Sequence, residues 1–189
     1  MEHALTQTHW DNYYNQGKDF GLITASMLDK VLSYIDTNDK KQVLDIGCGT
    51  GQLTRELYHR SYSCTGIDAS SVAIEKAKRY AVATHKLNYL VFNIEDDAIS
   101  TLPHQPYSII FCKLVYAFIH DKEKFLEKVQ SLLSAHGTFV LITPLRGDVP
   151  EKPNIEVDYN QTMLELQKRF TKIEIFTGLK VTYFICKRH

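Results

Sequence analysis

The stretch Val43-Leu44-Asp45-Ile46-Gly47-Cys48-Gly49-Thr50-Gly51, VLDIGCGTG in one-letter code, places three glycines at alternate positions directly after an apolar run. A short apolar run that ends at glycine predicts a buried β-strand followed by a turn. Glycine tolerates positive φ, and a glycine-rich turn between a strand and a helix lets a bound group lie against the main chain. The stretch therefore predicts a strand–turn–helix unit that contacts a ligand.

The spacing of the glycines separates the ligand classes. A dinucleotide-binding turn follows G-x-G-x-x-G, and its third glycine would fall at Gln52 or Thr54 in this chain. The Gly-Lys-Ser/Thr that completes a phosphate-binding P-loop does not follow the turn either. The pattern that is met is G-x-G-x-G. This weighs against a nicotinamide oxidoreductase and against a P-loop nucleotide site.

Strand-like and helical patterns alternate along the rest of the chain. Apolar runs occupy residues 42–46, 63–67, 87–92, 108–112, 138–143, 172–176 and 181–186. Amphipathic stretches cover 53–60, 70–84, 121–133 and 160–170, with Ser70 and Asp121 as caps and Gly137 as the end of the third. Such alternation predicts a doubly wound α/β sheet of seven strands, mostly parallel. Only four residues separate the last two runs, so these should form an antiparallel hairpin.

Composition and the N-terminal residues narrow the class of protein. Two helices are expected around 7–15 and over 22–35, as a cap of residues 1–40 on a core of residues 41–189 within one domain. Lys plus Arg and Asp plus Glu both number 22, which weighs against nucleic acid as the main partner. Neither a secretory signal nor a membrane-spanning run is visible, and the four cysteines lack metal-binding spacing. We therefore expect a cytoplasmic protein with no membrane or metal partner.

The glycine turn, Asp68 in TGIDAS, the terminal hairpin and the segment 106–144 together resemble the class I S-adenosylmethionine-dependent methyltransferases. The resemblance covers roughly Trp10 to the C-terminus and is strongest at the glycine turn. It implies a Rossmann-like fold, S-adenosylmethionine as the cofactor and methyl transfer as the activity. No appended recognition domain is visible, so we expect a small-molecule acceptor that reacts through oxygen, nitrogen or sulfur.

The resemblance also implies which residues contact the cofactor, at the ends of the first four strands. They are Asp45, Gly47, Cys48, Gly49, Gly51, Asp68, Ala69, Asn93, Ile94 and Lys113. The Asp68 carboxylate can accept hydrogen bonds from both ribose hydroxyls, or it can cap the next helix. Asp45 would lie near the cofactor's amino group or order the loop. Asn93 would contact adenine or serve only its turn, and Lys113 would point into the cleft or into solvent.

Three residues are candidates for the catalytic step: His120, Tyr14 and Tyr116. An unperturbed histidine titrates near neutrality, so His120 suits a general base, although it could also only cap or pack before the next helix. Tyr116 would line the pocket or the core. Tyr14 belongs to an aromatic stretch with Trp10 and Tyr13, which would form a lid over the cofactor or pack on the sheet.

Two other functions fit the same residues. A non-catalytic S-adenosylmethionine-binding module or subunit would keep the glycine turn and Asp68. An RNA methyltransferase would need a basic groove beside the cleft, for which Lys76, Lys78 and Arg79 are clustered, but on a helix that favours a solvated face. The sequence does not predict the oligomeric state.

Overall fold

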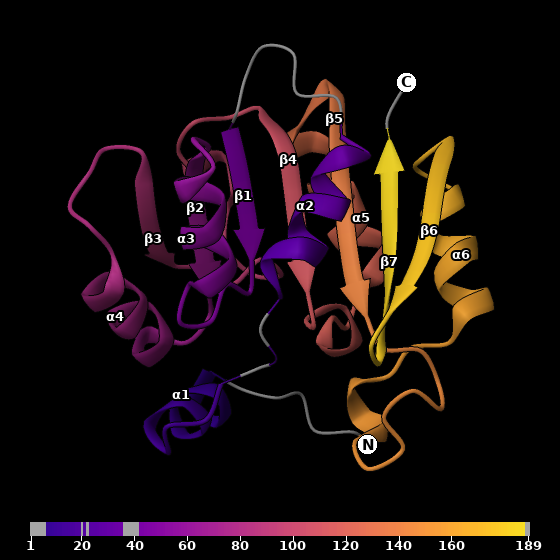
Figure 1. The fold of residues 1–189 in the computed structure, drawn as a ribbon, viewed down its shortest axis with the longest axis horizontal. Helices are drawn as coiled ribbons and strands as arrows, with labels where there is room; N and C mark the ends of the chain where they lie inside the picture. Colours follow the sequence, from indigo (N-terminus) through magenta and orange to yellow (C-terminus); the bar gives the residue numbers. More distant parts are fainter. Residues whose placement is uncertain (1–6, 20, 22, 36–41, 188–189) are drawn as a thin grey trace.

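The computed structural model describes residues 7–19, 21, 23–35 and 42–187. Its centre is one seven-stranded sheet with the order β3-β2-β1-β4-β5-β7-β6 (Figure 1). The strands are β1 Gln42–Ile46, β2 Ser63–Asp68, β3 Leu87–Val91, β4 Tyr107–Lys113, β5 Leu133–Thr143, β6 Lys172–Gly178 and β7 Val181–Lys187. The α-helices are α1 Gln7–Asn15, α2 Ala25–Ser33, α3 Gln52–His59, α4 Ser71–Tyr80, α5 Lys122–Leu132 and α6 Tyr159–Gln167, with 3₁₀ turns η1 Ile99–Thr101, η2 Tyr116–Phe118 and η3 Pro153–Ile155.

The pairing of the strands confirms the predicted sheet. β1 pairs in parallel with β2 and β4, β2 with β3, and β4 with β5, whereas β7 is antiparallel to both β5 and β6. The chain moves outward from β1 to β3 and then returns to β4 on the other side of β1. In an open α/β sheet a ligand binds at such a reversal, beyond the carboxyl ends of the strands.

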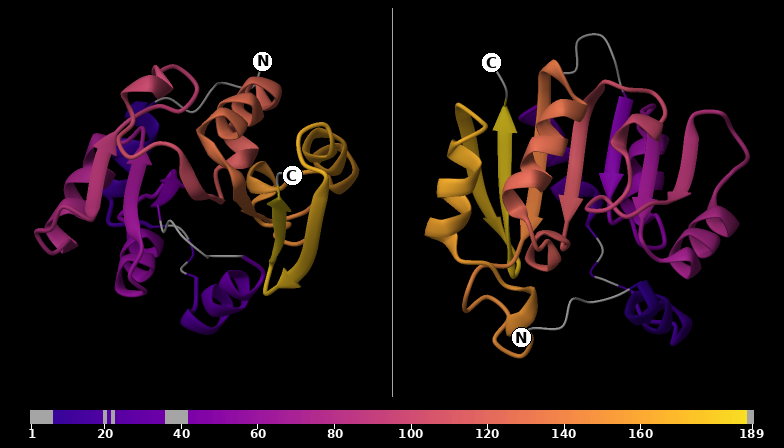
Figure 2. Two further views of the ribbon diagram at one scale, coloured as in Figure 1. Left: turned by 90° about the horizontal axis from the view of Figure 1, so that it is seen from above. Right: turned by 180° about the vertical axis from the view of Figure 1, so that it is seen from behind.

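Alternating side chains give the sheet two buried faces. In β4, Ile109 and Phe111 belong to one apolar cluster, and Ile110 and Cys112 belong to the other, as the two-residue period of a strand requires. The first cluster includes apolar side chains of α2, α3 and α4, and the second includes those of α5 and α6, so helices cover both faces (Figure 2). Burial on both sides explains why the inner strands β1, β4 and β7 are apolar along almost their whole length.

The expected caps are present at the helix starts. The Ser70 hydroxyl accepts from the backbone N–H of Ala73 at 3.1 Å, and the Asp121 carboxylate accepts from that of Lys124 at 3.0 Å. These contacts satisfy backbone donors that have no partner within the helix.

The helix expected over 121–133 is α5, with Asp121 as its N-cap and Leu133 as its C-cap, but the expectation that Gly137 ends it is wrong. α5 ends at Leu132, and the chain passes directly into β5, where Leu133 pairs with Tyr107 of β4. Gly137 therefore lies inside a strand, where an added Cβ would come within 2.8 Å of Leu133 Cδ2. Strand pairing, which the helical periodicity does not reveal, took these residues out of the helix.

At the N-terminus, α1 has the predicted bounds and lies beyond the carboxyl ends of the parallel strands (Figure 1). α2 begins at Ala25, and residue 22, where that helix was expected to begin, lies outside the described residues. The division into a cap of residues 1–40 and a core of residues 41–189 stays a prediction. Within the ranges described above, no helix combines the length and the apolar character needed to cross a membrane.

Candidate cofactor site

A pocket of about 730 Å³ lies at the carboxyl ends of β1, β2, β3 and β4 and beside α1. It contains most of the residues that the sequence indicated. These are Tyr14, Gly47, Cys48, Gly49, Asp68, Ala69, Asn93, Ile94, Lys113 and His120. The remaining three, Asp45, Gly51 and Tyr116, do not line it.

The glycine turn is tight because three neighbouring side chains close on it. Gly47, Gly49 and Gly51 have φ angles of 67°, 54° and 80°, in the left-handed region that favours glycine. An added Cβ would lie 2.1 Å from Val115 Cγ2 at Gly47 and 2.8 Å from the Tyr14 hydroxyl at Gly49. At Gly51 it would lie 2.6 Å from the hydroxyl of the β3 tyrosine, residue 89. The absent side chains therefore bring three separate elements against one turn.

Asp68 joins the end of β2 to this turn. Its two carboxylate oxygens accept hydrogen bonds from the backbone N–H of Gly49 at 2.8 Å and of Ser70 at 2.9 Å. The side chain is almost wholly buried, and burial raises its pKa to about 6 from 3.8, against the effect of the two hydrogen bonds. A carboxylate has about four acceptor positions, so two remain for hydroxyl donors in the pocket.

Asp45 lies beneath the turn, outside the pocket lining. It is buried and accepts a hydrogen bond from the Thr54 hydroxyl of α3 at 2.6 Å. Burial raises its pKa to about 6 as well. Gly51 is the N-cap of α3. Both residues therefore tie the turn to α3, which for Asp45 matches the loop-ordering alternative.

The Asn93 side chain is used within its own loop. Its Oδ1 accepts from the backbone N–H of Glu95 at 3.0 Å, its Nδ2 donates to Asp96, and its backbone N–H donates to Asp97 at 2.7 Å. Ile94, which follows, is buried and lines the pocket. The loop thus presents a shaped wall to the pocket, and the Asn93 amide holds that shape.

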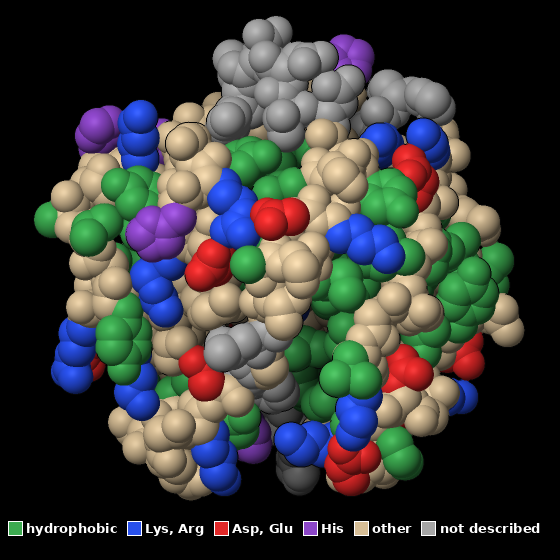
Figure 3. Space-filling view, viewed as in Figure 1, with side chains coloured by type: hydrophobic (Ala, Val, Ile, Leu, Met, Phe, Trp, Pro, Cys, Tyr) green, Lys and Arg blue, Asp and Glu red, His purple; other side chains and the backbone are tan. Residues whose placement is uncertain are grey.

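α1 is anchored to α4 by polar contacts. The Asp11 carboxylate accepts from the Ser70 hydroxyl at 2.6 Å and from the backbone N–H of Val72 at 3.3 Å. Lys76 Nζ donates to the backbone carbonyl of Tyr14. One member of the basic cluster on α4 therefore holds α1. The face of the molecule in Figure 3 intersperses Lys and Arg side chains with Asp and Glu.

The aromatic side chains of α1 reach the pocket. Tyr14 is buried, and burial and the neighbouring Asp68 raise the pKa of its hydroxyl, which keeps it protonated. The rings of Trp10 and Phe118 meet edge to face, with 5.0 Å between their centroids. Since both rings line the pocket, this contact joins α1 to η2 across its wall.

Tyr116 is placed elsewhere than in the pocket. Its ring is fully buried, and its hydroxyl donates to Glu165 of α6 at 2.6 Å. The expectation that it takes part in catalysis is therefore corrected: η2 turns this side chain to the opposite side, into the core. Lys113 does line the pocket, with its ammonium donating to the carbonyl of Gly21 at 2.7 Å, and burial lowers its pKa.

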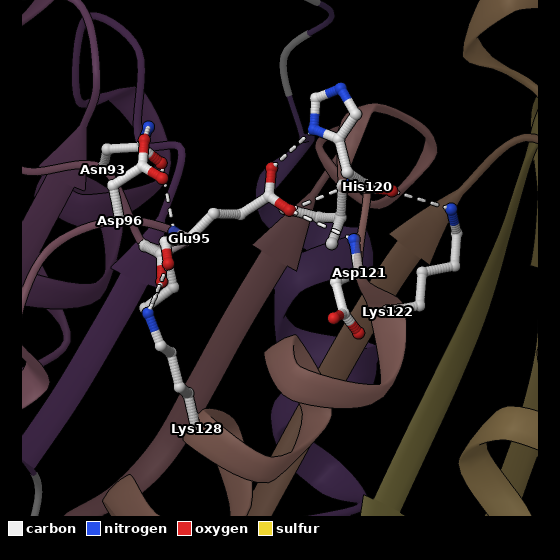
Figure 4. Close-up of polar contacts among 9 residues, drawn as sticks. Asn93, Glu95, Asp96, His120, Asp121, Lys122 and Lys128 are labelled. Atoms are coloured by element: carbon white, nitrogen blue, oxygen red, sulfur yellow. Dashed lines mark hydrogen bonds and ion pairs between the residues drawn. The ribbon is translucent and has the colours of Figure 1, made fainter. Parts of the chain in front are cut away.

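His120 forms a bridge with Glu95 (Figure 4). Glu95 Oε2 lies 3.0 Å from the imidazole Nδ1, and Oε1 accepts from the backbone N–H of His120 at 2.9 Å. The imidazole is about half exposed, and the carboxylate is mostly covered. In the sequence Glu95 is the first of three consecutive acidic residues, a pattern that does not indicate His120 as its partner.

Other pocket residues were missed in the sequence. Besides Glu95 they are Gln7, Asp19, Ile46, Phe92, Asp96, Leu114, Val115, Phe118 and Ile119. Most lie on irregular segments, where no periodicity indicates the direction of a side chain. Asp19, for example, accepts a hydrogen bond from the Thr50 hydroxyl, a contact between residues 31 positions apart.

This chain is similar in sequence and in fold to known methyltransferases. Residues 37–182 match the family described as "Methyltransferase domain". Over 140 residues the chain is 26% identical to the ubiquinone biosynthesis O-methyltransferase of Rickettsia canadensis (strain McKiel). The matched region covers 70% of this chain and 58% of that relative. Over 146 residues it is 28% identical to the mitochondrial ubiquinone biosynthesis O-methyltransferase of Schizosaccharomyces pombe. That match covers 74% of this chain and 52% of the relative.

A solved structure extends the comparison to almost the whole chain. The TehB-like SAM-dependent methyltransferase from Corynebacterium glutamicum superposes with a TM-score of 0.66 at 16% identity and covers 96% of this chain and 95% of that one, which supports the fold. The chain spans only a little over half the length of the two curated relatives. With the family match over most of its residues, the chain belongs to the class I S-adenosylmethionine-dependent methyltransferase family.

Proposed function

We propose that this chain binds S-adenosylmethionine and transfers its methyl group to a small-molecule acceptor. One observation carries the proposal: the Asp68 carboxylate lies in the pocket at the end of β2 and is bonded to the N–H of Gly49. The glycine turn is thereby hydrogen-bonded to the carboxylate that would bind the ribose hydroxyls. The names of the two curated relatives, both O-methyltransferases, support oxygen as the acceptor atom.

The chemistry of the pocket fits each part of this cofactor. Asp68 would accept from the ribose hydroxyls. The buried apolar side chains of Phe92, Ile94 and Ile119 would enclose the adenine ring. Asp19, whose carboxylate lies 3.4 Å from where a Cβ of Gly49 would be, would face the ammonium of the methionine part. A pocket of about 730 Å³ is in the usual range for a site of this kind.

The protein would act mainly by alignment. S-adenosylmethionine supplies an electrophilic methyl group on a sulfonium. A lone pair of the acceptor forms the new bond as the carbon–sulfur bond breaks with its electrons staying on sulfur, and the acceptor's proton passes to water at the pocket mouth. We place the acceptor beside Trp10 and Phe118, whose rings form a wall that excludes water and orients an aromatic or apolar ring. Tyr14, above the turn, would donate its hydroxyl proton in a hydrogen bond near the methionine part.

For His120 we propose the structural one of its two expected roles. Its backbone N–H and its Nδ1 both contact Glu95, in the loop next to the proposed adenine wall. A general base must lie within hydrogen-bond reach of the acceptor. We propose instead that His120 holds this loop through the Glu95 contact.

The test is calorimetric titration of the folded protein with S-adenosylmethionine and S-adenosylhomocysteine. We expect micromolar binding of both, followed by conversion of the first to the second when phenolic, amine and thiol acceptors are screened. Absence of binding to folded protein would refute the proposal. Binding without turnover of any acceptor class would favour the non-catalytic module.

A further inference from the structure

The Glu95 carboxylate contacts the turn at His120 and Asp121, and the proposed methyl transfer assigns no role to these contacts. We infer that Glu95 is a positioning residue that closes the nucleoside end of the pocket by holding the His120 turn. The inference rests on the proposed function, because it takes the adenine to lie beside Ile94. It concerns retention of the cofactor and not the transfer step.

The Glu95 carboxylate contacts three nitrogen atoms on one short segment. Oε1 accepts from the backbone N–H groups of His120, at 2.9 Å, and of Asp121, at 3.2 Å. Oε2 lies 3.0 Å from His120 Nδ1. Figure 4 shows the side chain extended toward this turn, with both oxygens engaged. Hydrogen bonds to an ionised acceptor are the strong kind, and two of these anchor backbone, which fixes the turn and not only one side chain.

The contact joins loops that the sheet holds apart. Glu95 follows β3 and His120 follows β4, and β2 and β1 lie between these strands. The link therefore crosses the carboxyl ends of β2 and β1, where Asp68 and the glycine turn lie. Because Glu95 and His120 both line the pocket, their contact forms part of its wall.

The Glu95 side of the link is held by α5. Lys128 Nζ donates to the backbone carbonyls of Ile94 at 2.8 Å and of Glu95 at 2.6 Å. The His120 side leads directly into the same helix, whose N-cap is Asp121. Both ends of the contact are thus tied to α5, so the carboxylate sits in place before a ligand arrives. Preorganisation of this kind strengthens binding because less ordering accompanies it.

Loss of the charge should therefore loosen the nucleoside end. In Glu95→Gln the amide oxygen can still accept, but the amide NH₂ replaces the oxygen that faces Nδ1 or the backbone donors. The His120 turn would then move away from the loop after β3, and a bound nucleoside would leave faster. We expect the Kd for S-adenosylhomocysteine to rise about tenfold, the loss of one charge-assisted hydrogen bond.

A matched control is available in Glu156. Its carboxylate also accepts from two backbone N–H groups of a surface loop, Gly147 at 3.2 Å and Val149 at 2.5 Å, but it lies outside the pocket lining. Glu156→Gln should lower the Tm without changing the Kd by more than about twofold. His120→Ala, which keeps the two backbone contacts, should raise the Kd by less than Glu95→Gln does.

The experiment is calorimetric titration of the full chain and these variants with S-adenosylhomocysteine, with thermal unfolding of each. A folded Glu95→Gln variant with the wild-type Kd would overturn the inference while leaving the proposed function intact. Should that variant not fold, Glu95→Asp keeps the charge and shortens the reach by one methylene, and an unchanged Kd there would overturn it equally. If folded wild-type protein binds no S-adenosylhomocysteine, the proposed function itself fails.

Discussion

Replacement of Asp68 by asparagine should stabilise the ligand-free protein at neutral pH and weaken cofactor binding at the same time. Burial raises the Asp68 pKa to about 6 from 3.8, so the ionised group destabilises the folded state. A difference of two pKa units corresponds to about 3 kcal/mol. Asparagine removes the charge but loses one of the two backbone hydrogen bonds, from Gly49 or Ser70, which costs about 1–1.5 kcal/mol. We expect a net gain of about 1–2 kcal/mol at pH 7.5.

The sign of the effect depends on pH. Because the pKa is raised in the folded state, the protonated Asp68 contributes stability below pH 3.8, and this contribution is lost as the pH rises through 6. The Asp68→Asn variant lacks this titration. Its free energy of unfolding should therefore fall below that of the wild type by about 1 kcal/mol near pH 4 and exceed it at pH 7.5.

The assay is urea unfolding of both proteins from pH 4 to pH 8, with calorimetric titration of S-adenosylhomocysteine at pH 7.5. One lost ribose contact should raise the Kd about 10–100-fold. Asp45→Asn is the matched control: its pKa is raised to about 6 for the same reason, but it lies outside the pocket lining. That control should gain stability and keep its Kd. If Asp68→Asn is less stable than the wild type at pH 7.5, or binds equally well, the reasoning about this carboxylate is wrong.

Three further substitutions test the turn, the core and the acceptor wall. Gly51→Ala should cost about 2 kcal/mol or more in urea unfolding, because its φ of 80° is strained for alanine and its Cβ would lie 2.6 Å from the Tyr89 hydroxyl. Tyr116→Phe removes the bond to Glu165 and should cost about 1 kcal/mol of stability, with turnover unchanged; reduced turnover at wild-type stability would return Tyr116 to the site. Trp10→Ala should raise the KM for the acceptor several-fold more than the Kd for S-adenosylhomocysteine, and equal effects on both would contradict the position that we propose for the acceptor.

The elements that the sequence predicted well are those with local causes. The inner strands β1, β4 and β7 could be predicted because burial on both faces of the sheet leaves a continuous apolar run in the sequence. The four-residue gap before β7 allowed only a hairpin, and the structure has one. The start of β5 was predicted poorly: the strand begins at Leu133 and includes Gly137, because Leu133 pairs with Tyr107, a residue 26 positions away.

The residues of the site also separate into those that the local sequence predicts and those that long-range contacts place. The glycine turn and Asp68 could be read from the sequence, because parallel strands bring their carboxyl ends to one edge and a turn of alternate glycines is a local signal. Tyr116 and His120, four residues apart, could not be assigned. Tyr116 begins the three-residue turn η2, and His120 lies beyond its end, so no helical pattern covers both residues. Long-range contacts decide that one side chain meets Glu165 in the core and the other meets Glu95 at the pocket.

The sequence by itself thus determined the α/β sheet, its closing hairpin, the glycine turn and the acidic residue at the end of β2. Only the tertiary structure decided which loops meet above that edge: α1 on α4 through Asp11, and the loop after β3 against the turn at His120. The physical reason is range. Strands and turns follow from residues within a few positions of each other, whereas the wall of a pocket depends on contacts between segments that the strand order brings together.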